Sequence, residues 1–344
     1  MVRTGIIATL VAVLAVGAAP AQAESGWITD GDGFLYKLNT ATGLATIVGS
    51  MSTSISALAG DGSSTLLGIE EGPGQEQHLV SLDVATAATD ERGLMDASDL
   101  WVSLTVTSDG TMYTASAGTT PHASIYEVDP ADGSMTPVGD AQSDSHFAAL
   151  AGGCGNTLVA ADQSNHLVSV DRATGVPTIF GALPAGGDPV VALAFDHQHG
   201  TLWAMSRSSA GDEHLFQVDP TAGGTTATTY LPGQIGSGPI GLAFDSPSAC
   251  RYQRKLSLAY SAKARKFTGR LTSGGWQPCA ASQKVSVFRK VTGPDDKLGT
   301  VRTSATGHFS LDKRLTRGSA YAVAPKSSKP STGVCLGASS GLVR

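Results

Sequence analysis

One fifteen-residue phrase occurs five times in the chain, and this repetition constrains the fold more than any other feature. It reads LYKLNTATGLATIVG from Leu35, LVSLDVATAATDERG from Leu79 and IYEVDPADGSMTPVG from Ile125, with further copies from Leu167 and Leu215. Apolar residues alternate on both sides of a central turn. This pattern predicts two short antiparallel strands, each with one buried face.

The turn inside each copy begins with a short polar side chain. These residues are Asn39, Asp83, Asp129, Asp171 and Asp219. Such a side chain accepts hydrogen bonds from the N–H groups of its own turn, and a following glycine adopts a positive φ. Hairpin chemistry therefore explains the phrase without a ligand.

A second recurring strand precedes each later copy, as in ISALAGD and VVALAFD, and a fifth, PIGLAFD, follows the last copy. The leucines that these strands share recur every 43 to 49 residues: Leu58, Leu104, Leu150, Leu193 and Leu242. Another apolar strand, such as TLLGIE or TLWAMS, lies between the strand with the shared leucine and the next copy of the fifteen-residue phrase. Each repeat therefore holds four short strands, which we label a, b, c and d in chain order.

The two ends of the repeat region complement each other. Residues 27–49 supply strands b, c and d, whereas residues 239–245 supply strand a alone. Four-stranded repeats of this size are typical of β-propellers, and no segment has the 3.6-residue period of helical solenoids. We predict an all-β chain with a five-bladed β-propeller, whose last blade is closed by the N-terminal strands. Closure removes the exposed sheet edges of an open array.

Charge divides the chain at the sequence CRYQRK. Between Glu24 and Cys250 there are 26 acidic and four basic residues, whereas Arg251 to Arg344 contain 18 basic and three acidic residues. We therefore predict an acidic propeller over residues 24–250 and a basic domain over residues 251–344. The basic domain contains short alternating strands between Gly, Ser and Asp turns, which predicts an antiparallel β-sandwich.

Residues 1–23 have the features of a secretory signal peptide: Arg3, an apolar run and the cleavage pattern Ala21-Gln22-Ala23. The apolar run is too short for a membrane span and lacks a basic stop-transfer flank. We therefore expect a secreted, extracellular protein. Its four cysteines should be oxidised, with three connectivities possible. They are Cys154, Cys250, Cys279 and Cys335.

The repeat region, Trp27 to Asp245, resembles the secreted bacterial propellers that carry LYxIDPxTGxxTxVG units. Propellers of this kind include lyases, dehydrogenases, lactonases and binding proteins, so the resemblance implies a fold but no particular activity.

The basic domain resembles the immunoglobulin-like or carboxypeptidase-regulatory-like modules that end many Gram-positive exported proteins. Their Thr-x-x-x-Gly-x-Phe/Tyr hairpin matches Thr303, Gly307 and Phe309. Such modules are usually non-catalytic. The resemblance favours a Cys279–Cys335 disulfide, with one cysteine before the VSVFRK strand and one near the end. Cys154 and Cys250 would then form the second disulfide by elimination, although they occupy a–b turns of different blades.

The b–c loops emerge on one face of the predicted propeller and carry many of its polar residues. They present Asp30, Asp32, Glu70, Glu71, His78, His122, Asp162, His166, Arg207, Asp212 and His214. One interpretation is a ring of ligands for a metal or polar substrate. The other is a residue repeated with each blade and exposed at the start of strand c. Our candidate ligand-binding residues are Asp30, Glu70, His78, Asp162, His166, Arg207 and His214.

Other motifs give no catalytic assignment. DGDG at residues 30–33 resembles the opening of a calcium loop but lacks the downstream glutamate, so a turn is favoured. His197 and His199 in DHQHG are predicted to lie in a solvated a–b turn. GSGPIG precedes a strand, so it places no phosphate at a helix N-terminus. Streptogramin-lyase-like propellers place His and Glu around a divalent metal, and Glu70, His166 and His214 could mimic that arrangement, but their surrounding motifs do not match. We assign no catalytic residue, metal or cofactor.

Two functional hypotheses remain open. The first is a secreted binding or scaffold protein, whose basic module attaches to an anionic surface such as a cell-wall polymer through Lys263, Arg265 and Lys266. Nucleic acid is disfavoured because the basic residues lack an aromatic stacking pattern. Docking of the basic domain on the acidic one is an equal explanation of the charge split. The alternative function is a metal-dependent lyase or hydrolase that uses the b–c face.

Overall fold

The computed structural model describes most of the chain from Ser25 to Arg344. The described ranges are 25–60, 65–72, 76–95, 100–116, 125–139, 147–183, 188–208, 212–220, 222–231, 235–236, 238–244, 250–252, 254–273, 279–329 and 333–344. The predicted signal peptide and His122 lie outside them. Within these ranges no helix has the length and apolar character needed to cross a membrane.

The first twenty strands form five antiparallel sheets of four strands each. Sheet 1 contains β20 (Pro239–Phe244), β1 (Ser25–Asp30), β2 (Phe34–Asn39) and β3 (Leu44–Ser50). Sheet 2 contains β4 (Ile55–Gly60), β5 (Thr65–Glu71), β6 (Gln77–Asp83) and β7 (Thr89–Leu94). Sheet 3 contains β8 (Trp101–Val106), β9 (Met112–Ser116), β10 (Ile125–Val128) and β11 (Met135–Pro137). Sheet 4 contains β12 (Phe147–Gly152), β13 (Leu158–Asp162), β14 (His166–Val170) and β15 (Pro177–Ala182). Sheet 5 contains β16 (Val190–Asp196), β17 (Thr201–Arg207), β18 (Glu213–Val218) and β19 (Thr225–Leu231).

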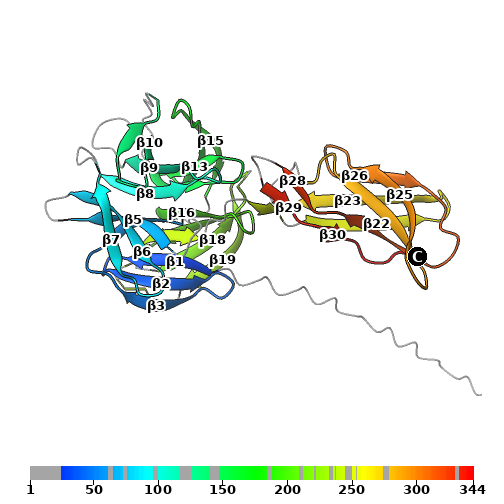
Figure 1. Cartoon of the computed structure of the whole chain (residues 1–344), viewed down its shortest axis with the longest axis horizontal. Helices are drawn as coiled ribbons and strands as arrows, with labels where there is room; N and C mark the ends of the chain where they lie inside the picture. Colours follow the sequence, from blue (N-terminus) through cyan, green and yellow to red (C-terminus); the bar gives the residue numbers. More distant parts are fainter. Residues whose placement is uncertain are drawn as a thin grey trace, which may run out of the picture.

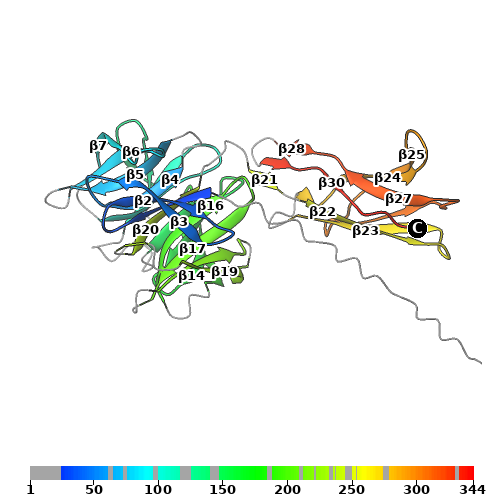
Figure 2. The same ribbon diagram turned by 90° about the horizontal axis from the view of Figure 1, so that it is seen from below.

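The five sheets form a closed ring. Their innermost strands contact one another in the order β20, β4, β8, β12, β16 and back to β20. β20 also pairs with β1, so the two ends of the repeat region share sheet 1 as the sequence predicts. Figures 1 and 2 show the sheets gathered into one body. This all-β arrangement is that of a β-propeller.

Both faces of each sheet are packed against neighbouring sheets. On β17, Trp203 and Met205 pack against Ile28 of sheet 1, whereas Leu202 and Ala204 join the cluster with sheet 4. The landmark leucines of the a strands are all buried, and four of them border a space of only about 10 Å³ between the inner strands. Such a space holds no more than about one water molecule. A ligand larger than water therefore does not fit in this space between the inner strands.

The repeated turns have the predicted chemistry. Asp83, Asp129 and Asp171 each accept the N–H of the residue two positions later, at 2.8 to 2.9 Å. Gly133 and Gly175 have positive φ in these turns, and in the copy without a glycine Ala87 takes this conformation instead, with φ 61°.

The C-terminal strands form a second, elongated body beside the ring (Figures 1 and 2). One sheet contains β22 (Arg254–Ser261), β23 (Lys266–Ser273) and β26 (His308–Asp312). The other contains β25 (Asp296–Arg302), β24 (Lys284–Lys290), β27 (Ser319–Ala324) and β30 (Ala338–Ser339). The two sheets enclose one apolar cluster that includes Phe267, Val285 and Phe309. We call this body the module.

Three short strands join the module to the ring. β21 (Arg251–Tyr252) pairs in parallel with β29 (Gly333–Cys335), which pairs with β28 (Ser327–Lys329). The disulfides Cys154–Cys250 and Cys279–Cys335 both form, which confirms the expected pairing. All four cysteines belong to one buried cluster with side chains of sheets 4 and 5.

Candidate functional site

The two ends of the ring have different surroundings. Antiparallel strands place the a–b and c–d turns at one end and the b–c turns at the other. The module joins the a–b end, where Arg251 donates its N–H to the carbonyl of His197 at 2.8 Å. Tyr252 lies against Gly200 of the same β16–β17 turn. The b–c end, which carries the predicted ligand-binding residues, therefore lies on the side away from this junction.

Asp30 and Asp162 hold the b–c turns of sheets 1 and 4. Asp30 Oδ1 accepts the N–H of Phe34 at 2.8 Å, and Asp162 Oδ1 accepts the N–H of His166 at 2.7 Å. Both aspartates are buried. Each carboxylate is used by its own turn, so turn chemistry accounts for the DGDG stretch.

Glu70 and His78 lie opposite each other on β5 and β6. His78 Nδ1 is 2.8 Å from Glu91 Oε1, and the Thr53 hydroxyl donates to Glu70 Oε1. Burial raises the pKa of the Glu70 carboxyl, whereas the charge of His78 lowers it and that of Glu91 raises it. These candidates form a local ionic group within sheet 2.

The other candidate histidines also have neighbours within their own sheets. His166 Nδ1 is 2.8 Å from Asp162 Oδ2, and the His214 ring stacks on Phe216 of the same strand. Among the described residues, no three side chains of His, Cys, Asp or Glu converge closely enough to hold a metal ion. The b–c end thus presents separate pairs in place of the ring of metal ligands considered from the sequence.

A mixed-charge cluster forms where sheet 5 meets sheet 1. Arg207 and Glu213 are cross-strand partners on β17 and β18, and Glu213 is only 4% exposed. Burial raises the pKa of Glu213, the charge of Arg207 lowers it, and Asp212 and Asp30 raise it. Two of the predicted candidates, Asp30 and Arg207, therefore act on one buried carboxyl group.

Tyr36 and the GSGPIG segment complete this cluster. The Tyr36 hydroxyl donates to Asp30 Oδ2 at 2.7 Å, and burial together with this bond raises the pKa of Tyr36 to about 12. The N–H of Gly236 donates to the same oxygen at 3.2 Å. A Cβ at Gly238 would lie 2.3 Å from Arg207 Cζ, so glycine allows the backbone to approach the guanidinium group.

The sequence prediction did not include Glu213, although a repeat marks its position. Gln77 and Asn165 also directly precede a histidine that starts or nearly starts strand c. Gln77 accepts the N–H of Trp101 at 2.7 Å, and Asn165 accepts that of Val190 at 3.0 Å. Each amide thus bonds the first residue of the next sheet's inner strand.

Glu213 takes this position beside sheet 1, where the pattern changes. The inner strand β20 starts at Pro239, which has no N–H to donate. The Glu213 carboxyl group therefore stands where the other two repeats have the amides of Gln77 and Asn165. Its cross-strand partner is Arg207, whereas those amides accept a backbone N–H. Alignment of QHLVSL, NHLVSV and EHLFQV would have singled out this residue.

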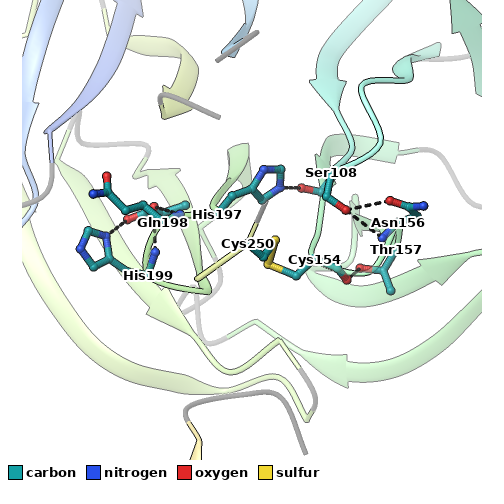
Figure 3. Close-up of a disulfide and its surroundings, with 10 residues drawn as sticks. Ser108, Cys154, Asn156, Thr157, His197, Gln198, His199 and Cys250 are labelled. Carbon is teal, nitrogen blue, oxygen red and sulfur yellow. Dashed lines mark hydrogen bonds and ion pairs between the residues drawn. A yellow bond between two sulfur atoms is a disulfide. The ribbon is translucent and has the colours of Figure 1, made fainter. Parts of the chain in front are cut away.

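The prediction of a solvated DHQHG turn is wrong for His197. This side chain is 1% exposed, and the backbone carbonyl of His197 accepts the N–H of Arg251 at the junction with the module. Its Nε2 is 2.7 Å from the carbonyl oxygen of Gly152, close to the Cys154–Cys250 disulfide (Figure 3). Burial lowers the pKa of His197. His197 is therefore part of the junction and does not form a chelating pair with His199.

The predicted polyanion-binding residues lie at the end of the module away from the ring. β22 starts at Arg254 beside the junction, and Lys263 and Arg265 occupy the turn that follows its far end. The N–H of Lys313 donates to the carbonyl of Arg265 at 3.0 Å, which brings a second basic loop beside this turn. Lys266 Nζ is 3.7 Å from Asp312 Oδ1.

No protein-family model and no curated protein match the chain. Among solved structures, it is similar to the gluconolactonase XC5397 from Xanthomonas campestris, with 14% identity, a TM-score of 0.42 and coverage of 74% of this chain and 84% of that one. A protein of unknown function from Bacteroides thetaiotaomicron has 15% identity, a TM-score of 0.39 and coverage of 53% of each chain. A protein with a provisional gluconolactonase assignment has 11% identity, a TM-score of 0.41 and coverage of 74% and 91%.

Proposed function

We propose that the chain is an extracellular binding protein that attaches to an anionic surface through its module and presents the b–c end of the ring to a ligand. In this proposal residues 1–23 are a signal peptide. The ring is a five-bladed propeller over residues 24–250, and the module is an immunoglobulin-like sandwich over residues 251–344. The disulfides and the five closed four-stranded sheets are consistent with this assignment.

The observation that carries the proposal is the cluster of basic side chains at the far end of the module. We call this cluster the basic tip; its members are Lys263, Arg265, Lys266, Lys313, Arg314 and Arg317. All but Lys266 are exposed, and in the described part of the chain only Lys266 of the six forms an ion pair. Exposed cations in excess over neighbouring carboxylates attract polyanions over roughly one Debye length, about 8 Å at physiological salt.

The position of the tip also disfavours the other explanation of the charge split, in which the basic domain docks on the acidic ring. Figures 1 and 2 show the module extending away from the ring from its junction at one end. The basic tip is therefore free to meet an external surface, while the acidic ring is held at a distance from that surface.

Charge reversal of the tip should weaken attachment. In the mature full-length chain, the triple variant Lys263→Glu, Arg265→Glu and Lys266→Glu is expected to bind purified anionic cell-wall polymer at least about tenfold more weakly, since phosphate contacts by basic residues dominate such affinities. Binding by the unmodified chain should also fall steeply as salt rises. Equilibrium titration at several salt concentrations measures both effects.

Matched charge reversals on the ring provide the control. Lys37→Glu and Arg92→Glu change exposed cations that lie far from the tip in the fold, so polymer affinity should change less than about twofold, because charges beyond a Debye length are screened. Salt-insensitive binding, or equal losses in the ring and tip variants, would reject attachment through the tip.

A hydrolytic enzyme on the b–c end is the second candidate, and one observation favours it. Glu213 is a buried carboxyl group with a raised pKa beside Arg207, at a position where two other repeats have structural amides. Burial that raises the pKa of a carboxyl group favours its protonated form, which is the form that acts as a general acid.

Hydrolysis assays of lactones, esters and glycosides, before and after chelation, test this second function. The variant Glu213→Gln keeps a side chain of the same shape and restores the amide of the other repeats, so it should fold normally. If the chain is an enzyme of this kind, the variant should lose at least about 100-fold in kcat. Equal activity of the variant would exclude Glu213 as the acid.

A further inference from the structure

A groove of about 750 Å³ lies on the outer face of the three-stranded sheet of the module. Its floor includes Ala259, Thr268 and Ser310, which are paired across β22, β23 and β26 and are all exposed. Side chains alternate along a strand, so these three share the outward face with Ser257. A row of small side chains hollows this face between longer neighbours.

Three basic side chains border the groove: Arg270, Arg302 and His308. Arg270 and His308 lie directly opposite each other on neighbouring strands. Within the described residues, none of the three forms an ion pair with a carboxylate, and the three acidic residues of the domain belong to other ion pairs. The groove therefore has a basic border without a protein counterion.

The groove is continuous with the basic tip. Lys266 precedes Thr268 on the same outward face of β23, and it lies four residues from Arg270, which is about 13 Å along a strand. Beyond Lys266 lies the turn with Lys263 and Arg265. A single phosphate ion would contact one end of this surface, whereas an extended polyanion can contact both.

We propose that the groove binds a linear polyol-phosphate polymer, whose phosphodiester groups contact Arg270 and Arg302 at one end and the basic tip at the other. This inference rests on the proposed attachment function and names its ligand and its second contact area. Guanidinium groups bind phosphate oxygens through paired N–H donors. The hydroxyl groups of Ser257, Thr268 and Ser310 can exchange hydrogen bonds with the polyol.

The lining of the groove favours such a polymer over nucleic acid. The phenyl ring in the lining, Phe309, is only 6% exposed and packs in the core of the module. Single-stranded nucleic acid stacks successive bases on exposed aromatic faces, and of the two aromatic rings that line the groove only the His308 imidazole is exposed.

A negative charge on the floor tests the proposal in the mature full-length chain. Thr268→Glu changes an exposed side chain and is expected to weaken binding of purified poly(glycerol phosphate) at least tenfold. Thr300→Glu makes the same change at an exposed position on the other sheet and should alter affinity less than twofold. The double variant Arg270→Gln and Arg302→Gln should also bind more weakly and with a shallower salt dependence. All these variants should retain the wild-type Tm.

The outcomes separate this inference from the proposed function. If Thr268→Glu binds like wild type while the tip variant loses affinity, the groove is excluded and attachment through the tip stands. If the wild-type chain binds no poly(glycerol phosphate) even at low salt, while the tip variants lose affinity for another anionic wall polymer, only the ligand named here is overturned. If the wild-type chain binds none of the polyanions tested, both the groove proposal and attachment through the basic tip are overturned. Tighter binding of polygalacturonate or single-stranded DNA would also overturn the choice of a polyol phosphate.

Discussion

Removal of residues 24–50 is expected to abolish cooperative thermal unfolding of the ring. This segment contains β1, β2 and β3, three of the four strands of sheet 1. Without it, β20 loses its partner strand, and the clusters facing sheets 2 and 5 lose the fully buried Ile28, Leu35 and Leu38. Burial of such side chains contributes about 1.5–3 kcal/mol each, whereas a whole domain is stable by only about 5–15 kcal/mol. Calorimetry of the mature chain and the deletion variant measures the effect.

Two single substitutions test whether the ring loses stability because buried contacts of sheet 1 are lost, and not simply because the chain is shorter. Ile28 is fully buried on β1, and Ile28→Ala should lower the free energy of unfolding by about 2–5 kcal/mol. Ile47 on the outer strand β3 is 58% exposed, so Ile47→Ala should change it by about 0.5 kcal/mol or less. A sharp transition in the deletion variant, at the wild-type temperature, would contradict a ring closed by the N-terminal strands.

The strands and their order in the ring could be predicted because they depend on local patterns. Alternating apolar residues determine which face of each strand is buried, and the Asp or Asn turn determines where the hairpin bends. The unmatched strand a in PIGLAFD then required a partner, which the N-terminus supplies. Each of these steps uses residues that are close in sequence or that recur at a fixed period.

The junction and the mixed-charge cluster depend on how distant segments meet, and local patterns do not contain this information. His197 lies in a turn that looks solvated from its sequence, and it is buried because its ring reaches the Gly152 carbonyl of sheet 4, 45 residues away, while its own carbonyl accepts the N–H of Arg251. Asp30 and Tyr36 belong to one hairpin, but Gly236, which donates its N–H to the same Asp30 oxygen, lies 206 residues from Asp30 in the sequence. The candidate histidines His78 and His166 recur with the repeat, and the repeat places them in separate sheets, each beside a carboxylate of its own sheet.

The double variant Cys154→Ala and Cys250→Ala is expected to lower the free energy of unfolding by about 2–5 kcal/mol. The disulfide joins positions 96 residues apart, so its removal increases the conformational freedom of the unfolded chain. It also links the β12–β13 turn of sheet 4 to the segment that leaves sheet 1 for the module. Loss of this link should therefore allow the module to change its orientation relative to the ring. Denaturant titration measures the stability, and small-angle scattering measures the spread of domain orientations.

The second disulfide provides a matched control. Cys279–Cys335 joins positions 56 residues apart, and in the chain-entropy account this difference in loop length alters the stabilisation by only about 0.5 kcal/mol. Both ends of Cys279–Cys335 lie within the basic domain, whereas Cys154 belongs to the ring. Removal of either disulfide should thus cost a similar free energy, but only loss of Cys154–Cys250 should broaden the orientations in scattering. An unchanged scattering profile would mean that β21, Tyr252 and the packing around His197 hold the module without the covalent link. In that case the disulfide would act on the unfolded chain alone.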